Sequence, residues 1–194
     1  MQLLLVAPPG AGKGTQAAKL ASHYDIAHLS SGELLRQEVA AGTPTGQIAA
    51  DYQRRGDLVP DQLVLEVLTG PILEATRGNG YVLDGFPRTL PQAEEAYRLA
   101  QQLEGVELQA VIHLEVSRPE LRRRLLVRTE GDTRDDGTDA VIEHRLQVFD
   151  LETAPLLGFY GRRGLVVSIN GEQPVELVFA DITTAVDRLA QTRP

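Results

Sequence analysis

A strand-like apolar run that leads straight into a glycine-rich loop constrains this chain more than any other feature. Residues 2–6 are mostly leucine and valine, and the loop A-P-P-G-A-G-K-G-T occupies residues 7–15 directly after them. The amphipathic segment 14–24 follows and is predicted to be a helix. A strand, a loop and a helix in this order form a phosphate-binding site, because backbone N–H groups and the helix N-terminus surround an anion.

The side chains of the loop supply the chemistry that a bound phosphate needs. Lys13 can reach the outer phosphates of a nucleotide, and the Thr15 hydroxyl can meet a magnesium ion. The usual pattern fails at two positions, because Ala7 stands where a glycine is expected and Gly14 takes the Ser/Thr position. The predicted phosphate-binding residues are Gly10, Ala11, Gly12, Lys13, Gly14 and Thr15.

The rest of the chain alternates short apolar runs with amphipathic stretches. Further strands are predicted at 27–29, 81–84, 110–114 and 165–169, and helices at 31–41, 45–55, 61–76, 90–103, 119–128, 140–162 and 174–189. Ser30 and Glu33 have capping-box spacing, and Asp61 suits an N-cap. Apolar strands separated by helices predict an α/β fold: a doubly wound, five-stranded parallel sheet with helices on both faces and ligands at the carboxyl ends of the strands.

Composition excludes several classes of protein. With 194 residues and no cysteine, the chain can bury a full core, but it has no disulfide, no Cys-zinc site and no thiol nucleophile. A net charge of −8 argues against nucleic-acid binding through the whole surface. The apolar run at 3–7 is too short for a membrane span or a signal peptide, so we expect a cytoplasmic protein.

The basic residues are unevenly chosen, since Lys13 and Lys19 are the only lysines among nineteen basic residues and the rest are arginine. Genomic codon bias is one explanation of this use of arginine. Bidentate binding of phosphates by several arginines in an otherwise acidic protein is the alternative, and the positions of the arginines must decide between them.

Four further motifs identify a family. They are D-G-F-P-R at 84–88, S-G-E-L-L-R at 31–36, G-D-L-V-P-D at 56–61 and T-A-P-L at 153–156. Together with the glycine-rich loop, they make the chain resemble the nucleoside monophosphate kinases over essentially its whole length, and the short-lid bacterial adenylate kinases most closely. The resemblance implies a Mg²⁺-dependent, reversible transfer of a phosphoryl group from ATP to AMP.

The resemblance also implies roles for individual residues. The AMP site would comprise Ser31, Arg36, Asp57, Leu58, Val59, Gly85, Phe86, Pro87, Arg88, Gln92, Arg134 and Arg145. ATP would be bound by the glycine-rich loop, by Arg128 and by the backbone near Gln173. The catalytic set would be Lys13, Arg88, Arg124, Arg128, Arg134 and Arg145. Magnesium would be held through phosphates and water, supported by Thr15 and Asp84, with no direct protein ligand.

The same resemblance divides the chain into three parts. Residues 1–29, 60–127 and 140–194 would form the core, 30–59 an AMP-binding insert, and 128–139 a short lid that closes over the substrates. Relatives with long lids carry a four-cysteine zinc site there, which a chain without cysteine cannot build. We expect a monomer whose partners are ATP, AMP and ADP, with no nucleic acid and no membrane.

Two alternatives stay open. A UMP/CMP kinase shares the loop, the D-G-F-P-R motif and a short lid, although the run T-L-P-Q-A at 89–93 favours adenine. A nucleotide-dependent switch or binding module belongs to a different class. No Asn-Lys-x-Asp run for guanine is present, and a module that binds one nucleotide would leave the second phosphate clamp, Arg36 and Arg88, without a role.

Overall fold

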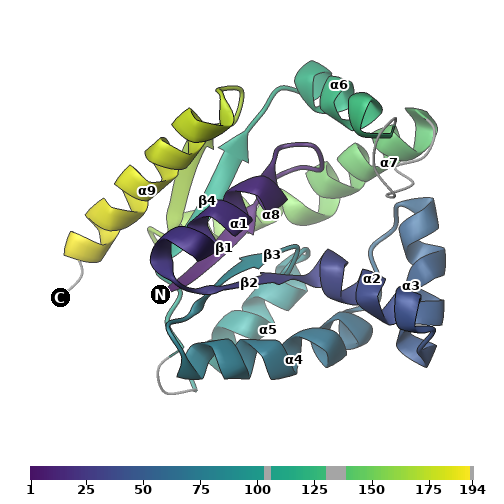
Figure 1. Cartoon of the computed structure of the whole chain (residues 1–194), viewed down its shortest axis with the longest axis horizontal. Helices are drawn as coiled ribbons and strands as arrows, with labels where there is room; N and C mark the ends of the chain where they lie inside the picture. Colours follow the sequence, from purple (N-terminus) through teal and green to yellow (C-terminus); the bar gives the residue numbers. More distant parts are fainter. Residues whose placement is uncertain (103–105, 130–138, 193–194) are drawn as a thin grey trace.

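A five-stranded, all-parallel sheet in the order β2-β3-β1-β4-β5 runs through the centre of the molecule (Figure 1). The computed structural model describes residues 1–102, 106–129 and 139–192, except the side chains of residues 128, 129, 190 and 192. The strands are β1 (Gln2–Val6), β2 (Ala27–Ser30), β3 (Tyr81–Asp84), β4 (Ala110–Glu115) and β5 (Val166–Asn170). This confirms the predicted α/β fold class.

Helices cover both faces of the sheet, and β1 shows why. Its side chains alternate, so that Leu3 and Leu5 pack into one apolar core while Leu4 and Val6 pack into the other. The first core is completed by α1 (Lys13–Tyr24), α6 (Arg118–Thr129), α7 (Asp139–Val148) and α9 (Val175–Thr192). The second is completed by α2 (Ser31–Ala41), α3 (Pro44–Arg55), α4 (Asp61–Arg77), α5 (Leu90–Ala100) and α8 (Pro155–Gly161).

The predicted helix over 140–162 is wrong as a single element. The structure divides it into α7, a π-helical turn η1 (Phe149–Thr153) and α8. Pro155 has no N–H to donate to a preceding turn, so α8 begins at the proline instead of continuing the earlier helix.

One of the two predicted helix caps is confirmed. The Ser30 side chain accepts a hydrogen bond from the Glu33 N–H at 3.3 Å and so caps α2. Asp61 is not the cap of α4, because Pro60 holds that position without a side-chain hydrogen bond. The Asp61 carboxylate instead accepts a hydrogen bond from the Gln92 amide.

The carboxyl ends of β1, β2 and β3 lie at one edge of the sheet, since the strands are parallel and adjacent. The glycine-rich loop follows β1, α2 follows β2, and Gly85 follows β3. Segments far apart in the sequence are therefore brought together there. No helix in the described ranges has the length and apolar character needed to cross a membrane.

Helices α2 and α3 approach each other closely at Gly46, to the right of the sheet in Figure 1. A Cβ atom added at Gly46 would lie 2.1 Å from the Glu38 carbonyl oxygen, which is backbone and cannot move aside. Thr43 strengthens this junction, because its side chain accepts from the Gly46 N–H at 3.0 Å and donates to the Glu38 carboxylate at 2.6 Å. The two helices therefore form a tightly joined pair.

We expect Gly46→Ala to lower the free energy of unfolding by about 1–3 kcal/mol, because the added methyl group forces the α2–α3 junction apart. Gly158→Ala is the matched control, since a Cβ there meets only the end of Arg162 at 3.6 Å. That substitution, in an exposed helix interior, should raise stability by about 0.5–1 kcal/mol. Denaturant unfolding of both variants measures the contrast, and equal effects would contradict the close approach.

Candidate active site

The glycine-rich loop has the backbone that anion binding requires. Gly10 and Gly12 have φ of 85° and 95°, in the left-handed region that favours glycine, and Gly12 is the N-cap of α1. Lys13 opens the helix, and its ammonium group donates to the carbonyls of Ala7 and Pro8 at 2.6 and 3.0 Å. Ala7 is not among the described residues with positive φ, so alanine satisfies the position where glycine is usual.

Two neighbouring pockets lie at this edge of the sheet. The larger, about 760 Å³, is lined by Gly10, Gly12, Lys13, Gly14 and Thr15 of the loop, together with Asp84, Pro87 and Arg124. The smaller, about 430 Å³, is lined by Ser31, Asp57, Leu58, Val59 and Gln92. Gly85 lines both pockets, and so do three arginines, Arg36, Arg88 and Arg145.

Burial and neighbouring charges both act on Arg88. Burial lowers its pKa, and the neighbouring charges of Arg145 and Arg36 lower it further, while Asp84 opposes them. Its guanidinium donates to the Gly85 carbonyl at 2.6 Å and to the Ser31 hydroxyl at 3.4 Å, and it has no ion pair with a carboxylate of the described chain. A buried guanidinium without an ion pair, with two further arginines close by, favours a bound anion.

Ser31 and Gln92 position this centre through hydrogen bonds. The Ser31 hydroxyl, 1% exposed, donates to the Gly85 carbonyl at 2.7 Å. The Gln92 side chain accepts from the Arg88 N–H at 2.6 Å and donates to Asp61. A primary amide retains one further N–H and one further lone pair, and these are what Gln92 can offer a ligand.

The segment around Asp57 contacts α7 as well as the smaller pocket. His144 Nε2 lies 2.8 Å from Asp57 Oδ1, and the Arg55 guanidinium donates to the same carboxyl group at 2.9 Å. The aliphatic part of Arg145 packs against Gly56, where an added Cβ would lie 2.7 Å from Arg145 Cγ. The contact between Asp57 and His144 could not be predicted from local sequence patterns, because the two residues are 87 positions apart.

The structure leaves some predicted residues outside the pockets. Phe86 and Ala11 are buried in the apolar cores. The Gln173 side chain donates to the Asn170 carbonyl at 3.2 Å and to Asp181 at 2.8 Å. Arg134 and the Arg128 side chain lie outside the described residues, as does most of the segment expected to be the lid.

The donors at the larger pocket suit magnesium. The Thr15 hydroxyl and the Asp84 carboxylate are the hard oxygen donors that Mg²⁺ prefers, and both line the pocket beside the loop. Within the described ranges, no cluster of three or more His, Asp or Glu side chains could hold a metal by itself. Such a site is compatible with an ion bound mainly by phosphates and water.

Comparisons with known proteins agree on one family. The family model for adenylate kinase matches residues 5–165. An adenylate kinase from Parasynechococcus marenigrum (strain WH8102) is 46% identical over 182 residues, covering 94% of this chain and 96% of the relative. An adenylate kinase from Thermobifida fusca (strain YX) is 43% identical over 186 residues, covering 96% of this chain and 98% of the relative. One from Xanthomonas campestris pv. campestris (strain B100) is 40% identical over 188 residues, covering 97% of this chain and 100% of the relative.

The contacts of Asp57 lead to a testable pH dependence. The hydrogen bond from Arg55 lowers the pKa of this carboxyl group most, and the contact with His144 lowers it further. Because the folded-state pKa is depressed, the stability contributed by Asp57 is present above the ordinary value of 3.8 and is lost as the pH falls through the folded-state pKa.

We expect carboxyl-carbon NMR to give an Asp57 titration midpoint below 3.8 in the wild-type protein. Arg55→Ala should raise that midpoint more than His144→Gln does, since Arg55 contributes the larger effect. An unchanged midpoint in both variants would mean that these contacts do not persist in solution.

Proposed function

The chain belongs to the adenylate kinase family and catalyses the reversible reaction of ATP and AMP to two ADP, and we propose that the two pockets divide the substrates. The larger pocket, with the glycine-rich loop, receives the ATP phosphates, and the smaller pocket receives AMP. The observation that carries this assignment is the set of three arginines, Arg36, Arg88 and Arg145, that line both pockets. The transferred phosphoryl group would pass between the pockets beside these residues.

This arrangement suits the chemistry of phosphoryl transfer. The reaction needs little covalent assistance from the protein, and most of the rate enhancement comes from alignment and from positive charge around the transferring group. Two nucleotides bring many negative charges into one small region. The partly buried guanidinium groups supply opposite charge there before the substrates arrive, so little reorganisation is required during the reaction.

On the AMP side, Arg36 and Arg88 would hold the phosphate, and Arg145 would reach the phosphoryl group in transit. The walls of the AMP pocket would be formed by the main chain at Asp57, Leu58 and Val59, together with Gly85 and Pro87. The remaining N–H and lone pair of Gln92 would meet the adenine edge. Ser31 acts on the same site by holding Gly85 and Arg88. Phe86 would act indirectly, through its packing in the core beneath the site.

On the ATP side, the backbone from Gly10 to Thr15, including Ala11, would surround the phosphates, with Lys13 directed at the outer ones and Arg124 beside them. Arg128 and Arg134 would add charge from the lid, and the backbone near Gln173 would contact adenine. Thr15 and Asp84 would hold Mg²⁺ through water, and the bound ion would neutralise phosphate charge.

The division into a core (1–29, 60–127, 140–194), an AMP-binding insert (30–59) and a short lid (128–139) completes the proposal. Closure of insert and lid would exclude water, which protects the phosphoryl group from hydrolysis. The absence of cysteine supports a lid without a Cys-zinc site. We further propose that the enzyme works as a cytoplasmic monomer, because its nucleotide substrates are pooled there and each chain has both pockets.

The two-pocket assignment is tested with Arg88→Ala. We expect KM for AMP to rise and kcat to fall, together lowering kcat/KM for AMP by at least about a hundredfold, since a charged hydrogen-bonding group at the phosphate is lost. ATP affinity, measured by calorimetry, should change less than about threefold. Arg98→Ala is the control, because Arg98 is exposed and pairs with Glu95 away from the pockets. Equal losses for both nucleotides would contradict the assignment.

The base preference is tested with a panel of monophosphates. Adenine presents a donor and an acceptor that one amide can pair with, whereas uracil reverses this pattern. A mispaired buried polar group costs about 1–3 kcal/mol, so AMP should exceed UMP in kcat/KM by roughly tenfold to a hundredfold.

Gln92→Leu should lose most of that preference, mainly through poorer use of AMP. It should also lower thermal stability, because the Arg88 N–H and Asp61 lose a partner. An unchanged ratio of AMP to UMP use in a folded variant would exclude Gln92 as the residue that recognises the base.

A further inference from the structure

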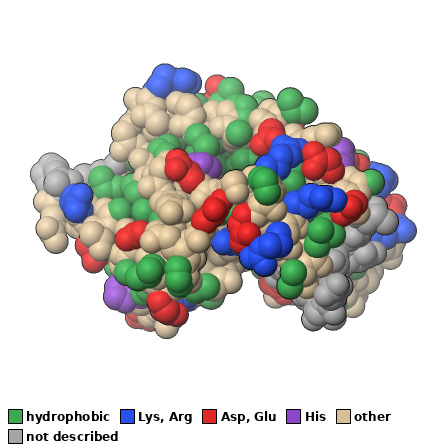
Figure 2. Space-filling view, turned by 90° about the horizontal axis from the view of Figure 1, so that it is seen from above, with side chains coloured by type: hydrophobic (Ala, Val, Ile, Leu, Met, Phe, Trp, Pro, Cys, Tyr) green, Lys and Arg blue, Asp and Glu red, His purple; other side chains and the backbone are tan. Residues whose placement is uncertain are grey.

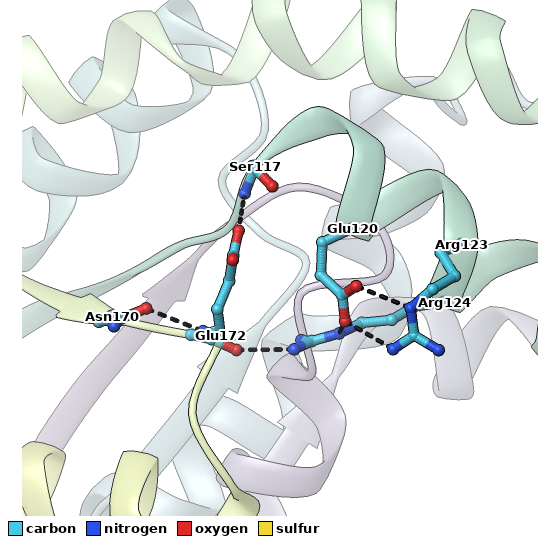
Figure 3. A network of polar contacts seen from close by, with 7 residues as sticks. Ser117, Glu120, Arg123, Arg124, Asn170 and Glu172 are labelled. Atoms are coloured by element: carbon cyan, nitrogen blue, oxygen red, sulfur yellow. Dashed lines mark hydrogen bonds and ion pairs between the residues drawn. The ribbon is translucent and has the colours of Figure 1, made fainter.

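The loop that follows β5 is joined to the start of α6 by several hydrogen bonds (Figure 3). The Glu172 carboxylate accepts from the Ser117 N–H at 2.6 Å, just before α6 begins. The Gly171 N–H also donates to the Glu115 carbonyl at 2.8 Å. Within the loop, the Glu172 N–H donates to the Asn170 side chain at 2.9 Å. These bonds fix the loop relative to the helix that carries Arg124.

Arg124 is held from two sides. Its Nη2 donates to the Gly171 carbonyl at 3.0 Å, and its Nε donates to Glu120 Oε1 at 2.7 Å. The side chains of Arg124 and Glu120 are 26% and 23% exposed, so solvent screens this pair less than it screens a fully exposed one. A guanidinium has five N–H donors, so donors remain for the larger pocket that Arg124 lines.

Glu120 also binds a second arginine, which provides an internal comparison. Arg123 donates to both oxygens of the Glu120 carboxylate at 2.7 Å, but its side chain is 64% exposed and lines neither pocket. The hydrogen bonds from Arg123 and then Arg124 lower the pKa of Glu120 to about 2. Glu120 is therefore ionised throughout the neutral range.

Resting on the proposed place of Arg124 at the ATP phosphates, we propose that Glu120 is a positioning residue that, with the Gly171 carbonyl, holds the Arg124 guanidinium in place before ATP binds. A long arginine side chain otherwise samples many rotamers, and restricting them beforehand removes part of the ordering cost from the binding step. The hydrogen bond from Arg124 to the Gly171 carbonyl also joins the loop after β5 to the arginine at the phosphates. The positions of the loop and of the arginine, on two sides of the ATP site, are therefore fixed relative to each other.

Charge repulsion by Glu120 and positioning of Arg124 by Glu120 predict opposite changes in ATP binding. Glu120 is a negative charge near the ATP phosphates, so its removal would strengthen ATP binding if simple repulsion dominated. If Glu120 acts by positioning Arg124, its removal weakens ATP use. The direction of the change in Glu120→Ala therefore distinguishes the two effects.

The experiment compares Glu120→Ala, Glu120→Gln, Arg124→Ala, Arg123→Ala and the double variant Glu120→Ala/Arg124→Ala in the full chain. Steady-state kinetics give kcat and KM for ATP and for AMP, calorimetry gives ATP affinity, and thermal unfolding monitors the fold. We expect Glu120→Ala to lower kcat/KM for ATP by about five- to twentyfold with KM for AMP nearly unchanged, because a misplaced arginine loses much of its effect.

Three further results are expected. Glu120→Gln, which keeps an acceptor oxygen, should recover part of the loss. Arg123→Ala should behave like the wild-type protein. In the Arg124→Ala background, Glu120→Ala should add less than about a twofold effect, since its action depends on Arg124.

The outcomes separate this inference from the proposed function. If Arg124→Ala leaves ATP use unchanged, the proposed place of Arg124 is wrong. If Arg124→Ala impairs ATP use but Glu120→Ala leaves it unchanged or tightens ATP binding, the positioning role alone is overturned. Equal losses for ATP and AMP with lower thermal stability would likewise overturn it, since a general folding role would then explain Glu120.

Discussion

Positive charge gathered at one edge of the sheet is the constraint on which the rest of the site depends. Arg36, Arg88 and Arg145 come from different segments of the chain. Burial lowers the pKa of Arg88 most, and the charges of Arg145 and Arg36 lie close enough to lower it further. Like charges repel strongly where water is partly excluded, so the fold must hold them in place by other means. Hydrogen bonds to Gly85 and Ser31, and the packing of Arg145 on Gly56, do this.

This arrangement explains how an acidic protein can bind highly charged substrates. Acidic and basic side chains are interspersed over the face shown in Figure 2, and many arginines outside the site pair with nearby carboxylates, as Arg54 does with Asp51. Arg36 is paired too, with Glu33 at 2.6 Å, but that partner is exposed and the arginine still lines both pockets. The charge that matters for function is therefore set by position and burial, and the net charge of −8 says little about it.

The sequence predicted the fold well because its signals were local. The apolar runs that became β1 and β3 have the predicted bounds, and the alternation of strands and helices specified a parallel sheet. The break between α7 and α8 was missed, since helical periodicity does not reveal a π-helical turn.

The Asp61 and His144 contacts were missed for another reason: their partners, Gln92 and Asp57, become neighbours only after the chain folds. Glu120 has the spacing of a helix pair with Arg124, but the Gly171 carbonyl that completes the arrangement lies 47 positions from Arg124.

The close approach at Gly46 has a consequence for motion. Helices that touch backbone to backbone cannot slide past each other without separating, so α2 and α3 are expected to swing as one rigid body and not to deform internally. The bending would then be confined to the chain on either side of the pair, near Ser30 and Pro60. The hydrogen bond between Asp57 and His144 connects the end of this rigid body to α7. It would favour the position of the helix pair in which these two residues are in contact. The rate of substrate exchange would then depend on how often this hydrogen bond opens, and a surface hydrogen bond would become part of the kinetic behaviour of the enzyme.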